Sequence, residues 1–264
     1  MNILFIGDIV GDRAVAELCA WLPGFRAERR VDLVVANAEN CAPTGLGMAG
    51  VQVDRLLAAG VDVITGGNHS WDSEESVQLL ELPQVLRPLN IDAHIPGRGL
   101  LHVGTPLGEV TVINLADHAA MRSVRAIEDT FRPAFGAWRE AERRGVVLVD
   151  YHGDHVLEKQ IFARAVDGVA TAVLGTHSHE ATIPLHVLPG GTGFVTEVGM
   201  TGPSDGMQGF AYDILVKGLH ETGDAFAHGI PPVSDGPLVL GAVLLRTEGR
   251  RTVGIERLTW GAGR

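Results

Sequence analysis

The sequence predicts an α/β fold, and two observations lead to that prediction. Short runs rich in Val, Ile and Leu recur along most of the 264 residues, and helix-like stretches lie between them. Continuous apolar runs of this length are typical of strands buried on both faces, with helices covering the sheet. The alternation of the two kinds of segment therefore indicates sheet layers flanked by helices.

The predicted strands are distributed unevenly along the chain. The second half has more strands than helices, so we expect a mixed or doubled sheet rather than a purely parallel one. The strands are expected at residues 3–6, 32–36, 61–65, 110–115, 146–150, 171–174, 183–188, 193–197, 238–245 and 252–258.

The predicted helices carry apolar side chains at helical spacing. Pro23 is expected to end or kink the first of them, because proline cannot donate a backbone hydrogen bond. Ser73, followed by two glutamates, is expected to begin another, since acidic residues favour the positive end of the helix dipole. The helices are expected at residues 13–30, 51–59, 73–82, 123–144 and 156–166.

We expect a single domain over residues 1–264. The sequence has no internal repeat, low-complexity segment or linker, and the stretch 228–237 (HGIPPVSDGP) is expected to be a loop inside that domain.

Composition excludes several classes of protein. Hydrophobic residues make up 45% and charged residues 20% of the chain, which argues against disorder. A net charge of −11 argues against binding a nucleic-acid polymer or an anionic membrane through the whole surface. Cys19 and Cys41 are too few for a disulfide framework. Residues 1–10 lack the basic start of a signal peptide, and no apolar run approaches the roughly 20 residues of a membrane span. We therefore expect a soluble, cytoplasmic protein.

Metal-capable side chains follow five of the predicted strands. In open α/β sheets, ligands bind just beyond the carboxyl ends of the strands, so neighbouring strands would bring these side chains into one crevice. The two histidines of the His-x-His pair would reach one centre only if the backbone bends there, because alternate residues of a strand face opposite sides. The side chains are Asp8, Glu39 with Asn40, Asn68, His152, and His177 with His179.

This set of side chains favours a transition-metal centre. Carboxylate, amide and imidazole donors suit Fe, Mn, Zn, Co or Ni better than Mg or Ca. Seven ligands are too many for one tetrahedral ion but natural for two ions that share a carboxylate. Two divalent ions, two carboxylates and a bridging hydroxide leave about +1, a local charge able to bind a phosphodiester on an acidic protein.

Five motifs resemble the calcineurin-like metallophosphoesterase superfamily, and most closely its YmdB-type branch, enzymes that act on cyclic nucleotides. They are GDIVGD (7–12), NAEN (37–40), GGNHSWD (66–72), DYH (150–152) and GTHSHE (175–180). The resemblance runs in order from residue 3 to about 210. It implies a four-layer αββα fold, a β-sandwich of two mixed sheets flanked by helices, with a dinuclear site at the strand ends.

The resemblance also implies a role for each site residue. His69 would donate a proton to the leaving oxygen, and Glu39 would bridge the two metals. Iron is the metal that the resemblance implies, with Mn and Zn left open. Asp8, Asn40 and His179 would hold the first ion, and Asn68, His152 and His177 the second.

The resemblance implies a phosphodiesterase that opens 2′,3′-cyclic nucleotides to nucleoside monophosphates through a metal-bridging hydroxide. Two alternatives stay open: a phosphomonoesterase or nucleotidase using the same site, and a regulatory protein that binds metal and nucleotide with little turnover. A metal-dependent amidohydrolase is disfavoured, because the His-x-His pair of that family follows the first strand rather than a late one. The native metal, the preferred base and homo-oligomerisation are not determined by the sequence.

Several nearby residues have two interpretations. Asp150 and Asp154 are expected either to orient a ligand imidazole or to lie on the surface. His118 and His155 lie near the predicted site without a role in the family pattern. Loop 41–48 is expected to line the pocket or to be a flexible connection, and Trp71 is expected to pack in the core rather than to stack on a base.

Overall fold

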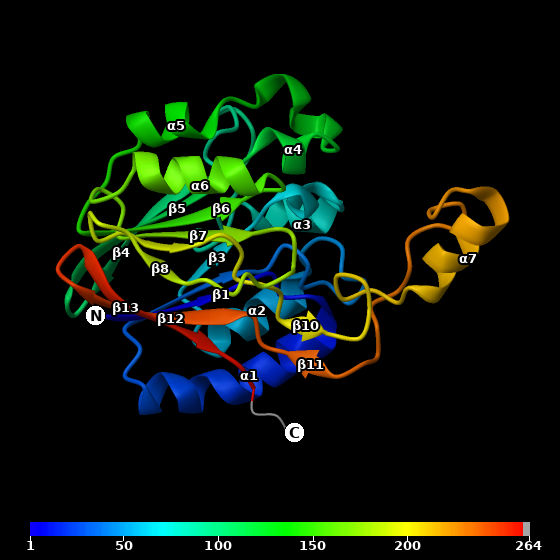
Figure 1. Cartoon of the computed structure of the whole chain (residues 1–264), viewed down its shortest axis with the longest axis horizontal. Coiled ribbons are helices and arrows are strands. Elements are labelled where there is room, and N and C mark those ends of the chain that lie inside the picture. The colour runs from blue at the N-terminus through cyan, green and yellow to red at the C-terminus, as the bar shows by residue number, and fades with distance from the viewer. Residues whose placement is uncertain (261–264) are drawn as a thin grey trace.

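The computed structural model describes residues 1–260, in which two β-sheets lie face to face and helices cover the outer face of each (Figure 1). The first sheet has the strand order β13-β12-β1-β2-β3. Parallel pairs join β1, β2 and β3, whereas β12 pairs antiparallel with both β1 and β13. The strands are β1 (Asn2–Ile6), β2 (Leu33–Asn37), β3 (Val63–Thr65), β12 (Ala242–Glu248) and β13 (Arg251–Leu258).

The second sheet has the strand order β4-β5-β6-β7-β9-β8 and is mixed as well. Strands β5, β6, β7 and β9 run parallel, and β4 and β8 are antiparallel edges. Its strands, together with the separate pair β10-β11, are β4 (Leu100–Thr105), β5 (Gly108–Ala116), β6 (Val146–His152), β7 (Ala172–Thr176), β8 (His186–Val187), β9 (Gly193–Val195), β10 (Gly202–Pro203) and β11 (Leu238–Val239).

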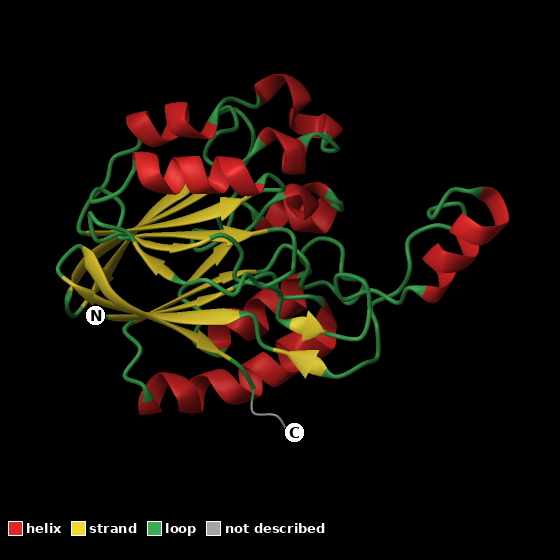
Figure 2. Ribbon diagram, viewed as in Figure 1, coloured by secondary structure: helices red, strands yellow, loops and turns green. Residues whose placement is uncertain are grey.

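The helices form the two outer layers, as the ribbon view shows (Figure 2). Helices α1 and α2 cover the first sheet, α5 and α6 cover the second, and α7 projects away from both. Within residues 1–260, no helix combines the length and apolar character that crossing a lipid bilayer requires. The helices are α1 (Gly11–Glu28), α2 (Gly50–Ala58), α3 (Glu74–Leu79), α4 (His118–Met121), α5 (Ala134–Glu140), α6 (Val156–Ala165) and α7 (Asp213–Thr222), with short 3₁₀ helices η1 (Asn68–Trp71) and η2 (Arg125–Thr130).

Strand β1 shows why the sheets are buried on both faces. Ile3 and Phe5 point into the core between the two sheets, whereas Leu4 and Ile6 point into the core under α1 and α2. Successive side chains of a strand face opposite sides, so a strand covered on both faces has a continuous apolar run where each face meets a core. The predicted α/β class and its two mixed, helix-flanked sheets are therefore confirmed.

Some predicted elements are wrong in their bounds. The helix expected at 123–144 is broken into η2 and α5, since Pro133 disfavours helical backbone at the residue before it and starts α5. Helix α1 continues through Pro23 instead of ending there. The strand expected at 238–245 is two strands, separated at Leu240 and Gly241. Strand β4 and helix α7 were not predicted at all.

Candidate metal centre

The carboxyl ends of β1, β2, β3, β6 and β7 meet at one edge of the two stacked sheets. Asp8 follows β1 by two residues, Glu39 and Asn40 follow β2, and Asn68 begins η1 just after β3. His152 is the last residue of β6, and His177 directly follows β7. The fold thus brings together donors that lie up to about 170 residues apart in the sequence.

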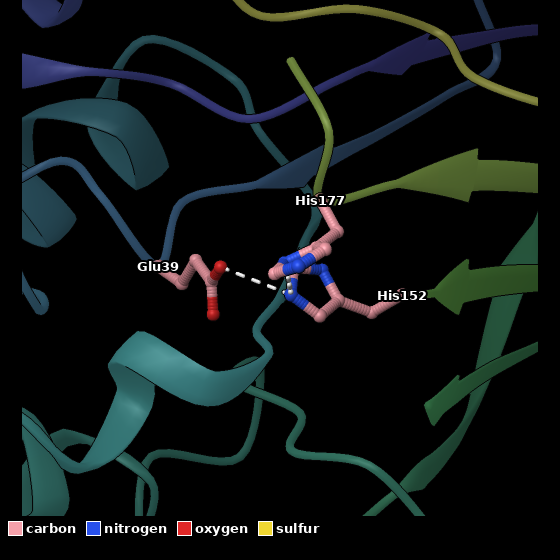
Figure 3. A group of neighbouring side chains, drawn as sticks. All are labelled: Glu39, His152 and His177. Atoms are coloured by element: carbon pink, nitrogen blue, oxygen red, sulfur yellow. Dashed lines mark hydrogen bonds and ion pairs between the residues drawn. The ribbon is translucent and has the colours of Figure 1, made fainter. Parts of the chain in front are cut away.

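Glu39, His152 and His177 form the centre of this cluster, with ligand-capable atoms all within 4.8 Å of one another (Figure 3). His152 Nε2 lies 3.1 Å from Glu39 Oε1 and 3.1 Å from His177 Nδ1. The same nitrogen lies 3.0 Å from Asn68 Oδ1. A single ring hydrogen cannot serve three acceptors at once, whereas a cation between them can be shared by all.

Asp8 and His179 form a second group next to this centre. Asp8 Oδ1 lies 3.9 Å from His179 Nε2 and 3.9 Å from His152 Nδ1. The other carboxylate oxygen of Asp8 accepts a hydrogen bond of 3.2 Å from the backbone N–H of His177. Asp8 therefore connects the two halves of the predicted ligand set.

Three buried oxygens of this cluster accept no hydrogen bond among residues 1–260: Asp8 Oδ1, Asn40 Oδ1 and Glu39 Oε1, although His152 Nε2 lies 3.1 Å from Glu39 Oε1 as an ion-pair contact. The amide of Asn40 is oriented by its Nδ2, which donates to Gly45 O at 2.7 Å and leaves Oδ1 free. An unsatisfied buried acceptor costs about 1–3 kcal/mol, so three in one site indicate a missing positive partner. The donor set fits divalent metal ions, as carboxylate and amide oxygens stand opposite imidazole nitrogens.

The backbone bends at the His-x-His pair, as it must if both histidines are to face one centre. His177 and His179 have φ angles of +104° and +64°, in the left-handed region that non-glycine residues rarely adopt. His179 Nδ1 lies 2.9 Å from Gln208 O, which leaves Nε2 to face Asp8. Strained backbone of this kind persists only where its surroundings enforce it, and it clusters at functional sites.

His69 lies beside the cluster and is tied to it through Glu39. Its backbone N–H donates to Glu39 Oε2 at 3.0 Å, and its ring Nδ1 lies 2.5 Å from Asp72 Oδ2. Burial opposes protonation of this ring, but the hydrogen bond to Asp72 and the negative charges of Glu39 and Asp72 together outweigh it and raise the pKa of His69. Asp72 therefore orients His69, while Glu74 and Glu75 lie in the first turn of α3 as expected.

Without metal, the charges of Glu39 and His152 stabilise each other. Burial alone would raise the pKa of Glu39, but the adjacent His152 lowers it to about 2. Burial alone would lower the pKa of His152, but Glu39 raises it to about 9. Burial and the charge of His152 together lower the pKa of His177 to about 3, which keeps that ring neutral and able to bind a cation.

Asp150 and Asp154, which the sequence left with two interpretations each, differ in burial. Asp154 is exposed, whereas Asp150 is fully buried and accepts hydrogen bonds from Thr176 Oγ1 at 2.6 Å and Thr65 Oγ1 at 2.5 Å. Thr176 Oγ1 also lies 3.0 Å from His152 Nδ1, so Asp150 supports that imidazole through the threonine hydroxyl. Burial raises the pKa of Asp150 to about 7, against the opposing effects of His152 and the two hydroxyl groups.

The other residues with open roles make contacts within the fold. His155 is exposed and caps helix α6, accepting a hydrogen bond of 3.4 Å from Glu158 N. His118 is exposed and packs edge-on against Phe131. Loop 41–48 supplies the carbonyl that orients Asn40, and Trp71 packs against the hydrophobic core as expected.

Sequence reasoning missed a buried ion pair, Lys159 with Glu197, that lies next to the His-x-His turn. A detectable signal existed, because Lys159 occupies the helix face that Phe162 and Ala163 bury. A lysine in that register needs an acidic partner inside the protein. Nothing in the sequence indicated that the hydroxyl groups of Thr65 and Thr176 donate hydrogen bonds to Asp150.

Comparison with known proteins gives three findings. A family model described as YmdB-like protein matches residues 4–258. A 2′,3′-cyclic-nucleotide 2′-phosphodiesterase of Bacillus subtilis (strain 168) is 32% identical over 265 residues, covering 98% of this chain and 96% of that protein. Two crystal structures each superpose with a TM-score of 0.87: a hypothetical protein from Thermus thermophilus (34% identity, 98% of this chain and 99% of that one) and a novel phosphatase from Mycoplasma pneumoniae (26% identity, 98% and 93%).

Proposed function

Because the chain belongs to the YmdB-like protein family and is a phosphoric ester hydrolase, we propose that it opens 2′,3′-cyclic nucleotides to nucleoside monophosphates at a centre of two metal ions. One observation carries this proposal: three buried oxygens that accept no hydrogen bond converge with three imidazoles at the strand ends. The name of the Bacillus subtilis relative supports the choice of a cyclic phosphodiester as substrate.

The contacts support a division of the ligands between two ions. Asp8 and His179 lie close together on one side, where Asn40 also leaves its amide oxygen free. Asn68 and His177 both contact His152 Nε2 on the other side. In the proposal, Asp8, Asn40 and His179 hold one ion, Asn68, His152 and His177 hold the other, and Glu39 bridges them. Iron is the proposed metal, and Mn or Zn would suit the same donors.

Two bound metal ions would explain how a protein with a net charge of −11 binds an anionic substrate. Two bound divalent ions would activate water and neutralise charge that develops on the phosphoryl oxygens. The chain itself contributes only two carboxylates, Asp8 and Glu39, among the seven proposed ligands. The local charge would therefore be positive enough to hold a phosphodiester monoanion, although the whole protein carries −11.

His69 is the proposed proton donor to the leaving oxygen. Asp72 holds its Nδ1, so Nε2 is the nitrogen left to face the substrate. The hydrogen bond from the His69 backbone to Glu39 couples the position of this acid to the metal ligands. Asp72 also raises the pKa of His69, which favours the protonated form that a general acid needs.

A substrate panel tests the proposed reaction. The metal-loaded protein should hydrolyse 2′,3′-cyclic nucleotides with a higher kcat/KM than 3′,5′-cyclic nucleotides or nucleoside monophosphates. Faster release of inorganic phosphate from monoesters than diester opening would instead establish a phosphomonoesterase. Binding of nucleotide without turnover of any substrate would indicate the regulatory alternative.

His69→Ala tests the proton donor separately from the metal centre. General acid catalysis contributes about 10²–10⁴-fold, so kcat on a 2′,3′-cyclic nucleotide should fall within that range while the metal content is retained. A diester with a nitrophenyl leaving group should be affected much less, because that group departs without a proton. His94→Ala is the matched control, since His94 forms a comparable pair with Asp92 on the exposed surface. Wild-type turnover of the natural diester by His69→Ala would rule out this assignment.

A further inference from the structure

The buried ion pair between Lys159 and Glu197 joins helix α6 to the segment that follows β9. Lys159 Nζ lies 2.8 Å from Glu197 Oε2, and both residues are only 2% exposed. Removing two charges from water is expensive, and apolar side chains of similar size often stabilise a core equally well. A charged pair in such a place therefore calls for a role beyond packing.

Both members of the pair bind the backbone of the His-x-His turn. Lys159 Nζ donates to Thr176 O at 2.8 Å, the carbonyl directly before His177. Glu197 Oε2 accepts from Ser178 N at 3.2 Å, between the two histidines. The pair therefore holds the turn at two backbone groups: Lys159 binds the carbonyl of Thr176, and Glu197 binds the N–H of Ser178.

The turn is the part of the site that needs such support. The left-handed φ angles of His177 and His179 are energetically unfavourable, and they persist only where surrounding contacts enforce them. Glycine at position 175 allows this arrangement, since a Cβ there would collide with Thr196 O and lie 3.1 Å from Lys159 Cδ. The absence of a side chain at this position therefore lets the Thr196 backbone approach β7 closely, with the Lys159 side chain beside it.

We propose that Lys159 and Glu197 are positioning residues that hold the His177–Ser178–His179 turn in its left-handed conformation, so that both imidazoles face the metal centre. The inference rests on the proposed function, because the turn matters only if its histidines bind metal. Neither residue touches the substrate in this account. Their effect on the reaction passes through the affinity of the site for metal.

Metal binding by folded variants tests the proposal, with Mn²⁺ as the probe. The variants are Lys159→Met, Glu197→Gln and the double variant, which leaves no unpaired buried charge and is therefore expected to fold even where a single variant does not. Phe162→Leu is the matched control, since it disturbs the buried face of the same helix without touching the turn. Circular dichroism identifies the folded variants, and calorimetric titration gives each Mn²⁺ dissociation constant.

The expected result is a dissociation constant raised about 10–100-fold in the ion-pair variants, the usual range for residues that orient metal ligands. Excess Mn²⁺ should restore much of the diesterase activity of the variants that circular dichroism shows to be folded without metal. An unchanged constant in the folded variants, or an equal rise in Phe162→Leu, would overturn the inference. If the wild-type protein itself binds no Mn²⁺, Fe²⁺ or Zn²⁺, the proposed function fails instead.

Discussion

The two sheets contribute different chemistry to the site. The first sheet and the loops after its strands supply the oxygen donors, Asp8, Glu39, Asn40 and Asn68, whereas the second sheet supplies the imidazoles of His152, His177 and His179. The oxygen donors stand on backbone of ordinary conformation. Among these seven residues, all within the described part of the chain, only His177 and His179 have positive φ angles.

In the proposed centre, the two sheets would prepare for a cation in different ways. The loops after the strands of the first sheet carry buried oxygens that accept no hydrogen bond, and these would attract a cation. The rings that end or follow the strands of the second sheet would have to be oriented, and a turn with positive φ angles and polar contacts behind the rings would do this. We therefore expect substitutions behind the imidazoles to act on metal affinity without removing any ligand.

The largest effect should follow removal of one ligand from either sheet. Asp8→Ala and His177→Ala should each weaken metal binding by more than about 100-fold, since even residues behind the ligands contribute about 10–100-fold. Metal content after dialysis and titration with Mn²⁺ measure this, with His94→Ala as the control. If His177→Ala retained wild-type affinity, the second sheet would not take part in binding, and the comparison between the sheets would fail.

A smaller effect should follow a change behind the imidazoles. Asp150→Asn keeps the shape of the side chain but weakens the support that reaches His152 through Thr176, so metal affinity or kcat should fall about 10–100-fold. Asp154→Asn is the matched control, because it makes the same chemical change at an exposed position of the same segment. Equal behaviour of the two variants would contradict a supporting role for Asp150.

The smallest effect is expected on the stability of the metal-free protein, through the ion pair between Glu39 and His152. The pKa of Glu39 is lowered to about 2, so its contribution to stability is complete above its ordinary value of 4.5 and is lost as pH falls through 2. The pKa of His152 is raised to about 9, so its contribution is complete below 6.5 and is lost as pH rises through 9. Glu39→Gln should therefore lower the melting temperature most between about pH 4.5 and 6.5.

Thermal unfolding of wild-type and Glu39→Gln protein in chelator across this pH range checks the sign. Each kcal/mol of the pair corresponds to about 2–4 °C in the melting temperature. A gap that widened as pH rose from 6.5 to 9 would show that Glu39 and His152 are not paired without metal.

Local sequence patterns were sufficient for the class of fold and for the expectation that the candidate side chains lie together at one edge of the sheets. Strands such as β1 carry an unbroken apolar run, Ile3–Ile6, because both of their faces are buried there, and this pattern is visible without a structure. Parallel strands of a sheet end at a common edge. Polar residues that directly follow such strands, as after β2 and β7, therefore predict a shared crevice before the structure is known. The motifs added the two-sheet arrangement through their resemblance to a known superfamily.

Tertiary packing determined what depends on partners far away in the chain. The break of the predicted helix at 123–144, the support of His152 by Asp150 rather than Asp154, and the pairing of Lys159 with Glu197 all belong to this group. Periodicity reports which face of an element is buried, but not which element covers it. Only packing brings two segments together, and only then do burial and hydrogen bonding determine the conformation of a turn or the charge of an acid.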